Sequence, residues 1–170
     1  MAKRSIDLAF DKLNASHYLG ESELLAVYED DKLSASEGVL AFQKLVDSDQ
    51  VQIVIGPFTS PVMAAIATKA DTAKVVIISG SCTSPNLAPG HPYVFLAAPT
   101  NNQQGKDLAR FACDSLKAKR IAVLGMTSEY GKTLSDALLD ELQTIGTTPV
   151  YKDYFAEGAN DFKAILTKMK

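Results

Sequence analysis

Small hydroxyl-bearing residues follow three apolar stretches of this sequence, and each group precedes a stretch with helical spacing. The three segments are VQIVIGPFTSP (51–61), KVVIISGSCTSP (74–85) and RIAVLGMTSEYGKT (120–133). The amino end of a helix has unpaired N–H groups and a partial positive charge, which attract carboxylates and phosphates. Hydroxyl side chains at the same place add donors that can orient the anion. The pattern therefore predicts a binding site for a small anionic group.

The residue types in these loops also allow a purely structural interpretation. Serine and threonine are common first residues of helices, so one such loop alone does not indicate a ligand. Three loops of the same kind, each after a predicted strand, favour a ligand site. The hydroxyl residues concerned are Ser60, Ser81, Thr83, Ser84, Thr127 and Ser128. Pro57 and Phe58 are either a wall for an apolar part of the ligand or packing residues.

The third loop looks like a nucleotide-binding P-loop but has the wrong spacing. A P-loop has four residues between its first glycine and its Gly-Lys-Ser/Thr, whereas five residues separate Gly125 from Gly131. The extra residue would break the cradle of successive N–H groups. No Gly-x-Gly-x-x-Gly follows a predicted strand either. The sequence therefore predicts no nucleotide and no other cofactor.

Cysteine and histidine do not form a catalytic or metal-binding pattern. Cys82 would need a base to act as a nucleophile, and His91 is separated from it by a turn-rich stretch with nothing evident to orient the ring. We interpret Cys82 as an inert small residue. Cys82 and Cys113 could form a disulfide, although two free thiols are favoured. No metal-ligand spacing is present, and the protein is predicted not to be an enzyme.

The charge pattern excludes several classes of partner. With 17 basic and 20 acidic residues the net charge is −3, and no block of like charge stands out. Neither a nucleic-acid groove nor a basic membrane surface is indicated. No apolar run has the length of a transmembrane helix. Residues 1–15 have the spacing of an amphipathic helix, and we expect no secretory signal there.

Apolar strands alternate with helical spacing along the whole chain, which predicts an α/β fold with doubly wound parallel sheets and right-handed crossovers. Strands are expected at 23–30, 51–56, 74–79, 93–99, 119–125 and 148–155, and helices at 3–15, 35–46, 61–71, 101–117, 129–144 and 159–169. The apolar run 51–56 is typical of a strand covered on both faces. Ligands bind at the carboxyl ends of such strands, where all three loops would lie.

Local signals mark the helix starts and one domain boundary. Ser34 with Glu37, and Thr100 with Gln103, have the spacing of capping boxes. Ser60 before Pro61 is a typical helix cap. The turn residues 99–102 predict a boundary between a first lobe, 1–99, and the beginning of a second lobe, 100–170.

Six stretches together resemble one known family. They are AVYEDDKLSASEGVLAFQKLV, IVIGPFTSPVMAAIA, VVIISGSCTSPNLA, YVFLAAPTNNQQGKDLA, RIAVLGMTSEYGKTLSDAL and DYFAEGANDFKAILTKMK. The chain is similar to the periplasmic solute-binding proteins of branched-chain amino acid ABC transporters. Their type I fold, with Rossmann-like lobes, also includes receptor ligand-binding domains. The resemblance implies that two lobes close about a hinge on an amino acid or related small carboxylate, and that the closed form docks on a membrane permease outside the cytoplasm.

The resemblance also implies roles for particular residues. The first lobe would hold the ligand's α-carboxylate and α-amino groups through Ser60, through the backbone of Ser81 and through the hydroxyl of Thr83. Tyr130 would approach from the second lobe. Phe58, Thr59 and Cys82 complete the set of candidate ligand contacts.

The chain departs from the family pattern at both ends. The family's first strand and the later part of the family's second lobe have no counterpart in this sequence, so the chain is expected to be about half of a complete protein. We expect it to bind weakly or not at all alone, or to associate with another copy. A sensor or receptor domain for amides or aromatic acids is the alternative function. An α/β enzyme is disfavoured because no acid–base or nucleophile–base pair is evident.

Overall fold

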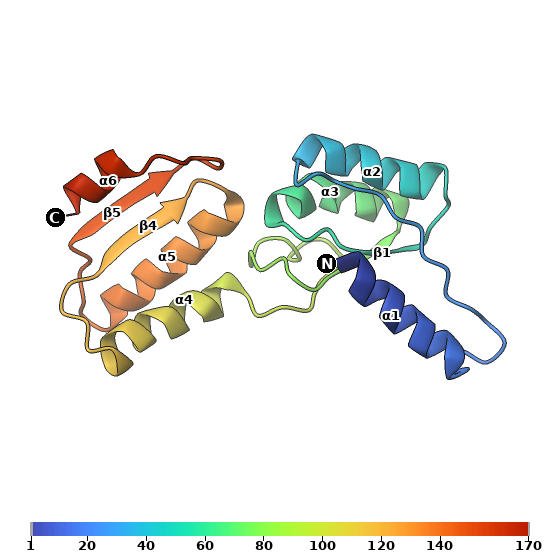
Figure 1. Ribbon diagram of the computed structural model, residues 1–170, viewed down its shortest axis with the longest axis horizontal. Coiled ribbons are helices and arrows are strands. Elements are labelled where there is room, and N and C mark those ends of the chain that lie inside the picture. Colours follow the sequence, from blue (N-terminus) through green and yellow to red (C-terminus); the bar gives the residue numbers. More distant parts are fainter. Residues whose placement is uncertain (1, 170) are drawn as a thin grey trace.

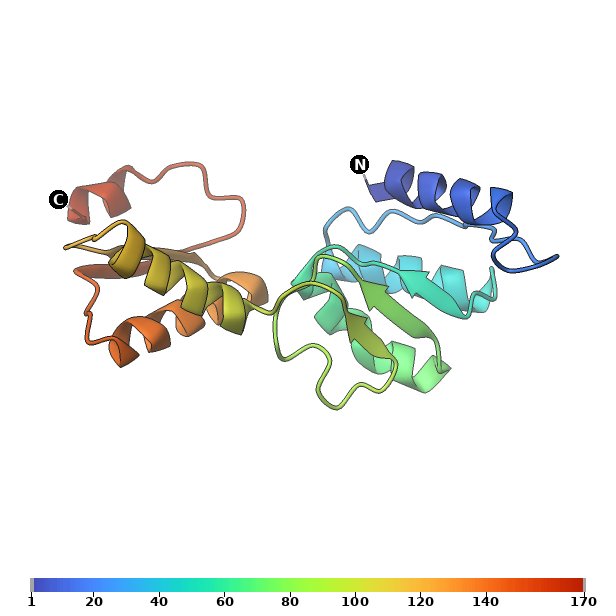
Figure 2. The same ribbon diagram turned by 90° about the horizontal axis from the view of Figure 1, so that it is seen from below.

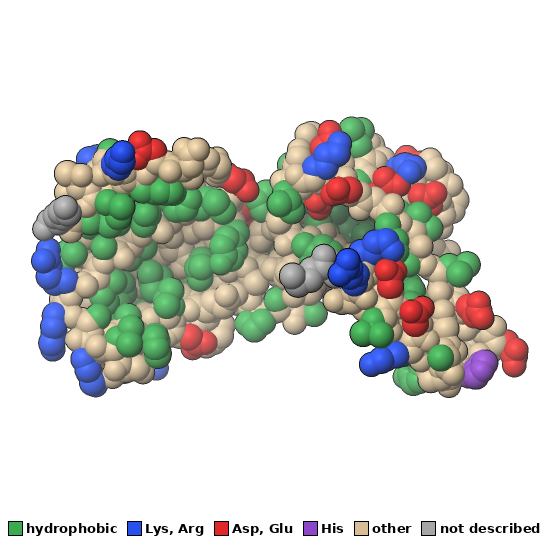
Figure 3. All heavy atoms as spheres, viewed as in Figure 1, with side chains coloured by type: hydrophobic (Ala, Val, Ile, Leu, Met, Phe, Trp, Pro, Cys, Tyr) green, Lys and Arg blue, Asp and Glu red, His purple; other side chains and the backbone are tan. Residues whose placement is uncertain are grey.

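The computed structural model describes residues 2–169 and contains two parallel sheets, one in each half of the molecule and each with its own helices (Figures 1 and 2). The first half holds the three-stranded sheet and the second half the two-stranded sheet, and Figure 3 shows a narrower waist between them. Met1 and Lys170 lie outside the described residues. The helices are α1 (Ala2–Ala15), α2 (Ala35–Asp47), α3 (Ser60–Ala73), α4 (Asn101–Arg110), the π-helical turn η1 (Phe111–Ser115), α5 (Glu129–Thr144) and α6 (Lys163–Lys168). The strands are β1 (Ile53–Ile55), β2 (Val76–Ser79), β3 (Val94–Leu96), β4 (Ala122–Met126) and β5 (Tyr151–Phe155).

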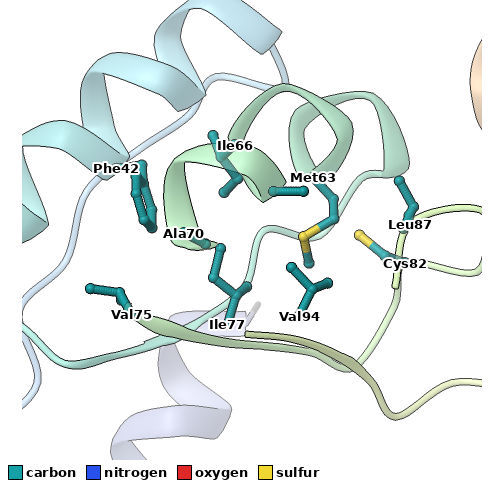
Figure 4. Close-up of a cluster of buried hydrophobic side chains, with 10 residues drawn as sticks. Phe42, Met63, Ile66, Ala70, Val75, Ile77, Cys82, Leu87 and Val94 are labelled. Atoms are coloured by element: carbon teal, nitrogen blue, oxygen red, sulfur yellow. The ribbon is translucent and has the colours of Figure 1, made fainter. Parts of the chain in front are cut away.

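The three-stranded sheet has the order β1-β2-β3 and packs against α3 on one face. Strand register aligns Val54 with Ile77 and Ile77 with Val94, and this row points toward α3. Figure 4 shows the cluster that results between α3, the sheet and Phe42 of α2. Its members are Phe42, Met63, Ile66, Ala67, Ala70, Val75, Ile77, Cys82, Leu87 and Val94. Removal of these apolar side chains from water supplies the main stabilisation of this half.

The two-stranded sheet pairs β4 with β5 in parallel, from Ala122 opposite Tyr151 to Met126 opposite Phe155. Helices α4 and α5 pack closely because Gly105 has no side chain. A Cβ at this position would come within 2.6 Å of the Ala137 Cβ and of the Leu138 nitrogen. Ala109, Val123 and Leu142 form the buried cluster between these elements.

The strand predicted at 23–30 is not formed. These residues have no regular secondary structure, and residues 25–30 line an apolar groove of about 760 Å³ whose other wall includes β1. The hydrogen bonds of Gln52 and Gly56 point to β2, so those of Ile53 and Ile55 point to the open edge. A strand needs a partner for its backbone groups, and residues 23–30 do not pair with the edge of β1. The apolar sequence was therefore insufficient to make a strand.

The prediction that residues 51–56 are covered on both faces is wrong. Ile53 and Ile55 are exposed, and so are Ile78 and Phe95, which align with Ile55 across the sheet. Helix α1 lies on this side of the sheet in Figures 1 and 4 but does not bury the row. The sheet is thus packed on one face.

Several local predictions are confirmed and others shift. Helix α5 has the predicted bounds, and Ser34 accepts a hydrogen bond from the Glu37 N–H at 3.5 Å. The cap of α3 is Thr59 and not Ser60, and neither Thr59 nor Thr100 makes a side-chain capping bond. The second hydroxyl loop does not begin a helix, because residues 80–93 contain only turns, bends and irregular backbone before β3.

Two predicted helices have different extents. The helix expected over 101–117 ends its α-helical part at Arg110 and continues as η1, and the last helix is shorter than 159–169. Residues 99–102 lie after β3 and at the start of α4, so the three-stranded sheet precedes them and the two-stranded sheet follows. Among the described helices, none has both the length and the apolar character needed to cross a bilayer.

Candidate functional site

The first two hydroxyl loops are joined to each other at the carboxyl ends of β1 and β2. Ser79 Oγ donates to the carbonyl of Pro57 at 2.7 Å, and Ser81 Oγ donates to the carbonyl of Phe58 at 2.8 Å. The N–H of Cys82 donates back to Ser79 Oγ at 3.1 Å. These bonds fix the position of the loop after β2 relative to the start of α3. The first two predicted loops are therefore held together by hydrogen bonds.

Cys82 lies in the hydrophobic core. Its side chain is fully buried among the residues that pack on α3, and Sγ lies 3.4 Å from the carbonyl of Pro57. Burial raises the pKa of the Cys82 thiol. This position favours the interpretation of Cys82 as an inert small residue over its role as a ligand contact. Cys82 and Cys113 are both free.

Two buried hydroxyl groups at this site have no hydrogen-bond partner within residues 2–169. They are Thr59 Oγ1, at the start of α3, and Thr83 Oγ1, in the loop after β2. Burying a hydroxyl without a partner costs about 1–3 kcal/mol. A polar ligand that bonds to them would recover this cost. Ser60, next to Thr59, is also buried.

The two helix starts near the site differ in charge. The first turn of α3 has no acidic residue and begins with Thr59, Ser60 and Pro61. The first turn of α5 carries Glu129, and Ser128 Oγ already accepts the N–H of Gly131 at 3.2 Å. The partial positive charge of α5 is therefore offset by a carboxylate, whereas that of α3 is available. A bound anion is better stabilised at α3.

Tyr130 reaches the same region from the other half of the molecule. Its side chain is 39% exposed, and its carbonyl accepts a hydrogen bond from Asn101 Nδ2 at 3.0 Å. The backbone N–H of Asn101 donates to the carbonyl of Thr83 at 2.6 Å. The structure thus places the loop of Thr83 and the loop of Tyr130 on either side of Asn101. Figure 1 shows that α5 begins where the two halves meet.

Phe58 is 42% exposed and lies beside Gly56 and Pro57, at one end of the apolar groove along β1. Ser81 is exposed, but its hydroxyl is used in the bond to Phe58. Its backbone N–H makes a long contact of 3.4 Å with Ser79 Oγ. Phe58 and Ser81 therefore lie on the solvent-exposed side of the site.

Catalytic chemistry has no support in the geometry of the described residues. His91 Nδ1 lies 2.6 Å from Asp71 Oδ2, near the end of α3, whereas Cys82 lies with the loops at the start of that helix. Cys82 and His91 therefore do not form a nucleophile–base pair. Within residues 2–169, no group of three or more His, Cys, Asp and Glu side chains is arranged to hold a metal ion.

Sequence reasoning missed three polar residues that connect the loops. Asn101 is fully buried, Glu129 is partly buried, and Asn86 is exposed; none stood out by spacing. Asn101 follows the predicted cap Thr100, and Glu129 follows the cap Ser128, so each occupies the first position of a helix. A polar residue there, next to a predicted ligand loop, is the signal that could have identified them.

Comparison with known proteins gives a consistent result. The profile of a family described as periplasmic binding protein matches residues 1–170. A Leu/Ile/Val-binding protein of Rhizobium johnstonii is 31% identical over an alignment that covers 99% of this chain and 46% of that protein. The chain therefore spans about half the length of such relatives.

Solved structures agree in fold. The substrate-binding protein of a branched-chain amino acid transporter from Streptococcus pneumoniae, in complex with isoleucine, superposes with a TM-score of 0.87 at 30% identity. The match covers 96% of this chain and 46% of that one. A type 1 periplasmic binding protein from Bordetella pertussis gives a TM-score of 0.85 at 25% identity, over 98% and 47% of the two chains.

These matches confirm the predicted α/β fold with lobes of the type I periplasmic binding proteins. The names of the family and of these relatives are those of binding proteins and not of enzymes, as the sequence predicted. The chain belongs to the periplasmic binding protein family.

Proposed function

We propose that this chain is the ligand-binding part of an extracytoplasmic solute-binding component of an ABC transporter. The ligand is a branched-chain amino acid or a related small carboxylate, held between a first lobe, 1–99, and a second lobe, 100–170. Two unpartnered buried hydroxyls carry the proposal: that of Thr59, at the uncompensated amino end of α3, and that of Thr83, in the adjoining loop after β2. They supply donors where a carboxylate is best stabilised.

Each residue of the proposed site has a distinct role. Thr59, Ser60 and Thr83 bind the polar end of the ligand from the first lobe. Phe58 provides an apolar wall, and Tyr130 covers the ligand from the second lobe. Such a division between a few polar groups and apolar walls is usual for small-molecule sites.

The relatives support the ligand class. One carries the name of a Leu/Ile/Val-binding protein, and one was solved with isoleucine. The proposal includes a membrane permease as partner and a periplasmic or extracellular location, and the names of the family and of the same relatives support both.

The proposal requires at least weak binding by the chain alone. Titration of the ¹⁵N-labelled chain with isoleucine tests it, because amide shifts detect even millimolar binding. We expect saturable shifts at Thr59, Thr83 and Tyr130, and their loss in Thr83→Val, which keeps the shape of the side chain. Thr72→Val, on the exposed side of α3, is the matched control and should bind as the parent does. Shifts that are absent for leucine, isoleucine and valine, or that lie away from these loops, would contradict the proposal.

A further inference from the structure

Two hydrogen bonds converge on one carboxylate at the junction of the two halves. Ser84 Oγ donates to Glu129 Oε1 at 3.0 Å, and Asn86 Nδ2 approaches the same oxygen at 3.4 Å. Ser84 and Asn86 belong to the loop after β2, whereas Glu129 is the first residue of α5. The contacts therefore join segments that are more than forty residues apart in sequence.

The burial of the donor makes this contact more than a surface pair. Ser84 is fully buried, and Glu129 Oε1 is the acceptor that its hydroxyl reaches. A buried hydroxyl that loses its acceptor is left with the cost of its desolvation. Bonds to an ionised group are also stronger than bonds between neutral groups. Separation of the two halves at this point would therefore be opposed.

Asn101 makes a second connection beside the first. It donates through Nδ2 to the carbonyl of Tyr130 and to Thr133 Oγ1, at 3.0 and 2.6 Å. Its backbone N–H donates to the carbonyl of Thr83. The bond between Ser84 and Glu129 and the bonds of Asn101 therefore lie close together. Ser84 is adjacent in sequence to Thr83, and Glu129 is adjacent to Tyr130.

We propose that Glu129 is a positioning residue for the ligand site, acting as a clasp between the loop of Thr83 and the start of α5. The clasp consists of Ser84, Asn86 and Glu129. It sets the separation between the two sides of the site without touching the ligand, and it favours the arrangement in which both sides contact the ligand. This inference rests on the function proposed above.

The clasp has a thermodynamic consequence for binding. A ligand that bridges both sides binds only to the arrangement in which they are close, so its apparent affinity falls with the population of that arrangement. Loss of the carboxylate should lower that population. We expect Glu129→Ala to weaken isoleucine binding about tenfold, while Glu129→Gln, which keeps an acceptor oxygen, retains most of the affinity.

The test measures the separation of the halves directly and without ligand. Spin labels on Thr68→Cys of α3 and Gln143→Cys of α5, both exposed positions, would be placed in a Cys113→Ser background. The parent chain should give one narrow distance distribution. Glu129→Ala and Ser84→Ala should each broaden this distance distribution, whereas Glu129→Gln should keep it narrow. The matched acid variant Asp140→Ala, on the exposed side of α5, should leave it unchanged.

The variants also guard against simple misfolding. Ser84→Ala leaves α5 intact, so a change seen in both single variants does not arise from a damaged helix. The double variant should broaden the distribution no further than either single variant. Unchanged distributions in Ser84→Ala and Glu129→Ala, with isoleucine still bound, would overturn the clasp alone. Broadened distributions without any isoleucine binding in the parent would overturn the proposed function and, with it, the role of Glu129 in binding.

Discussion

Helices α3 and α1 lie on opposite sides of the three-stranded sheet, and they are attached by different forces. Helix α3 contributes Met63, Ile66 and Ala70 to a cluster that excludes water. Helix α1 is joined to residues 23–30 by polar contacts: Tyr28 Oη donates to Asp7 at 2.7 Å, and Asn14 exchanges two hydrogen bonds with Leu24. Lys3 lies over the Tyr28 ring and also pairs with Asp7.

The difference shows where the stability of this half resides. Ile77 and Ile78 are adjacent and of one type, but Ile77 is fully buried under α3 whereas Ile78 is 40% exposed on the side of α1. Exposed ion pairs and hydrogen bonds contribute little compared with apolar burial. The α3 side therefore stabilises the sheet, and the α1 side is a loosely attached layer.

Truncation of Ile77 and of Ile78 should show the largest difference between the two sides of the sheet. We expect Ile77→Ala to lower the free energy of unfolding by about 2–5 kcal/mol, since it opens a cavity in the core. Ile78→Ala should cost about 1 kcal/mol or less, because its side chain already meets water. Urea denaturation followed by circular dichroism measures both, and equal losses would show that the α1 side is packed as well.

Amide hydrogen exchange should separate the two helices next. We expect amides in the middle of α3 to exchange at least about a hundredfold more slowly than those of α1, because α1 can detach without opening the core. Mass spectrometry of peptides from each helix gives both rates. Similar protection would mean that α1 opens only with the whole half.

The two cysteines should differ in reactivity. Cys82 is fully buried beneath α3 and its pKa is raised by burial, so little thiolate forms at neutral pH. Cys113 is partly buried in the other half. A disulfide reagent should therefore label Cys113 first and Cys82 only as the chain unfolds, which Cys113→Ser separates cleanly. Rapid labelling of both thiols in the native chain would contradict the packing described for α3.

The smallest effect concerns the polar attachment of α1. The hydrogen bond to Asp7 raises the pKa of Tyr28 to about 12, and the same bond, followed by the bond from Lys3, lowers the pKa of Asp7. The stabilisation of the folded chain that comes from Tyr28 is thus present below pH 10 and is lost as the pH rises through about 12. That of Asp7 is present above its ordinary pKa and lost as the pH falls through its lowered value.

Asp7→Asn should return the pKa of Tyr28 toward its ordinary value, which ultraviolet titration of the phenol detects. Tyr28→Phe identifies the signal, because the shifted titration should disappear in that variant. A titration that does not change in Asp7→Asn would show that another group holds α1.

Local sequence signals are sufficient to predict several elements of this fold, whereas features that depend on contacts between distant segments are not. The cap Ser128 and the apolar spacing after it were enough to predict α5, and the three loops were found from strand ends alone. The strand predicted at 23–30 does not form because a strand depends on a partner, which no local pattern supplies. The buried position of Cys82 and the bonds of Asn101 and Glu129 depend in the same way on segments far apart in sequence.

The open edge of β1 has a consequence for how the chain behaves in solution. The backbone groups of Ile53 and Ile55 point to this edge, and their exposed side chains border the groove formed with residues 25–30. An apolar edge of this kind is a template for pairing with another chain. Salts such as sulfate strengthen apolar burial, so we expect them to lower the concentration at which the protein precipitates. For this chain, colloidal behaviour and not folding is expected to limit the concentrations that an experiment can reach.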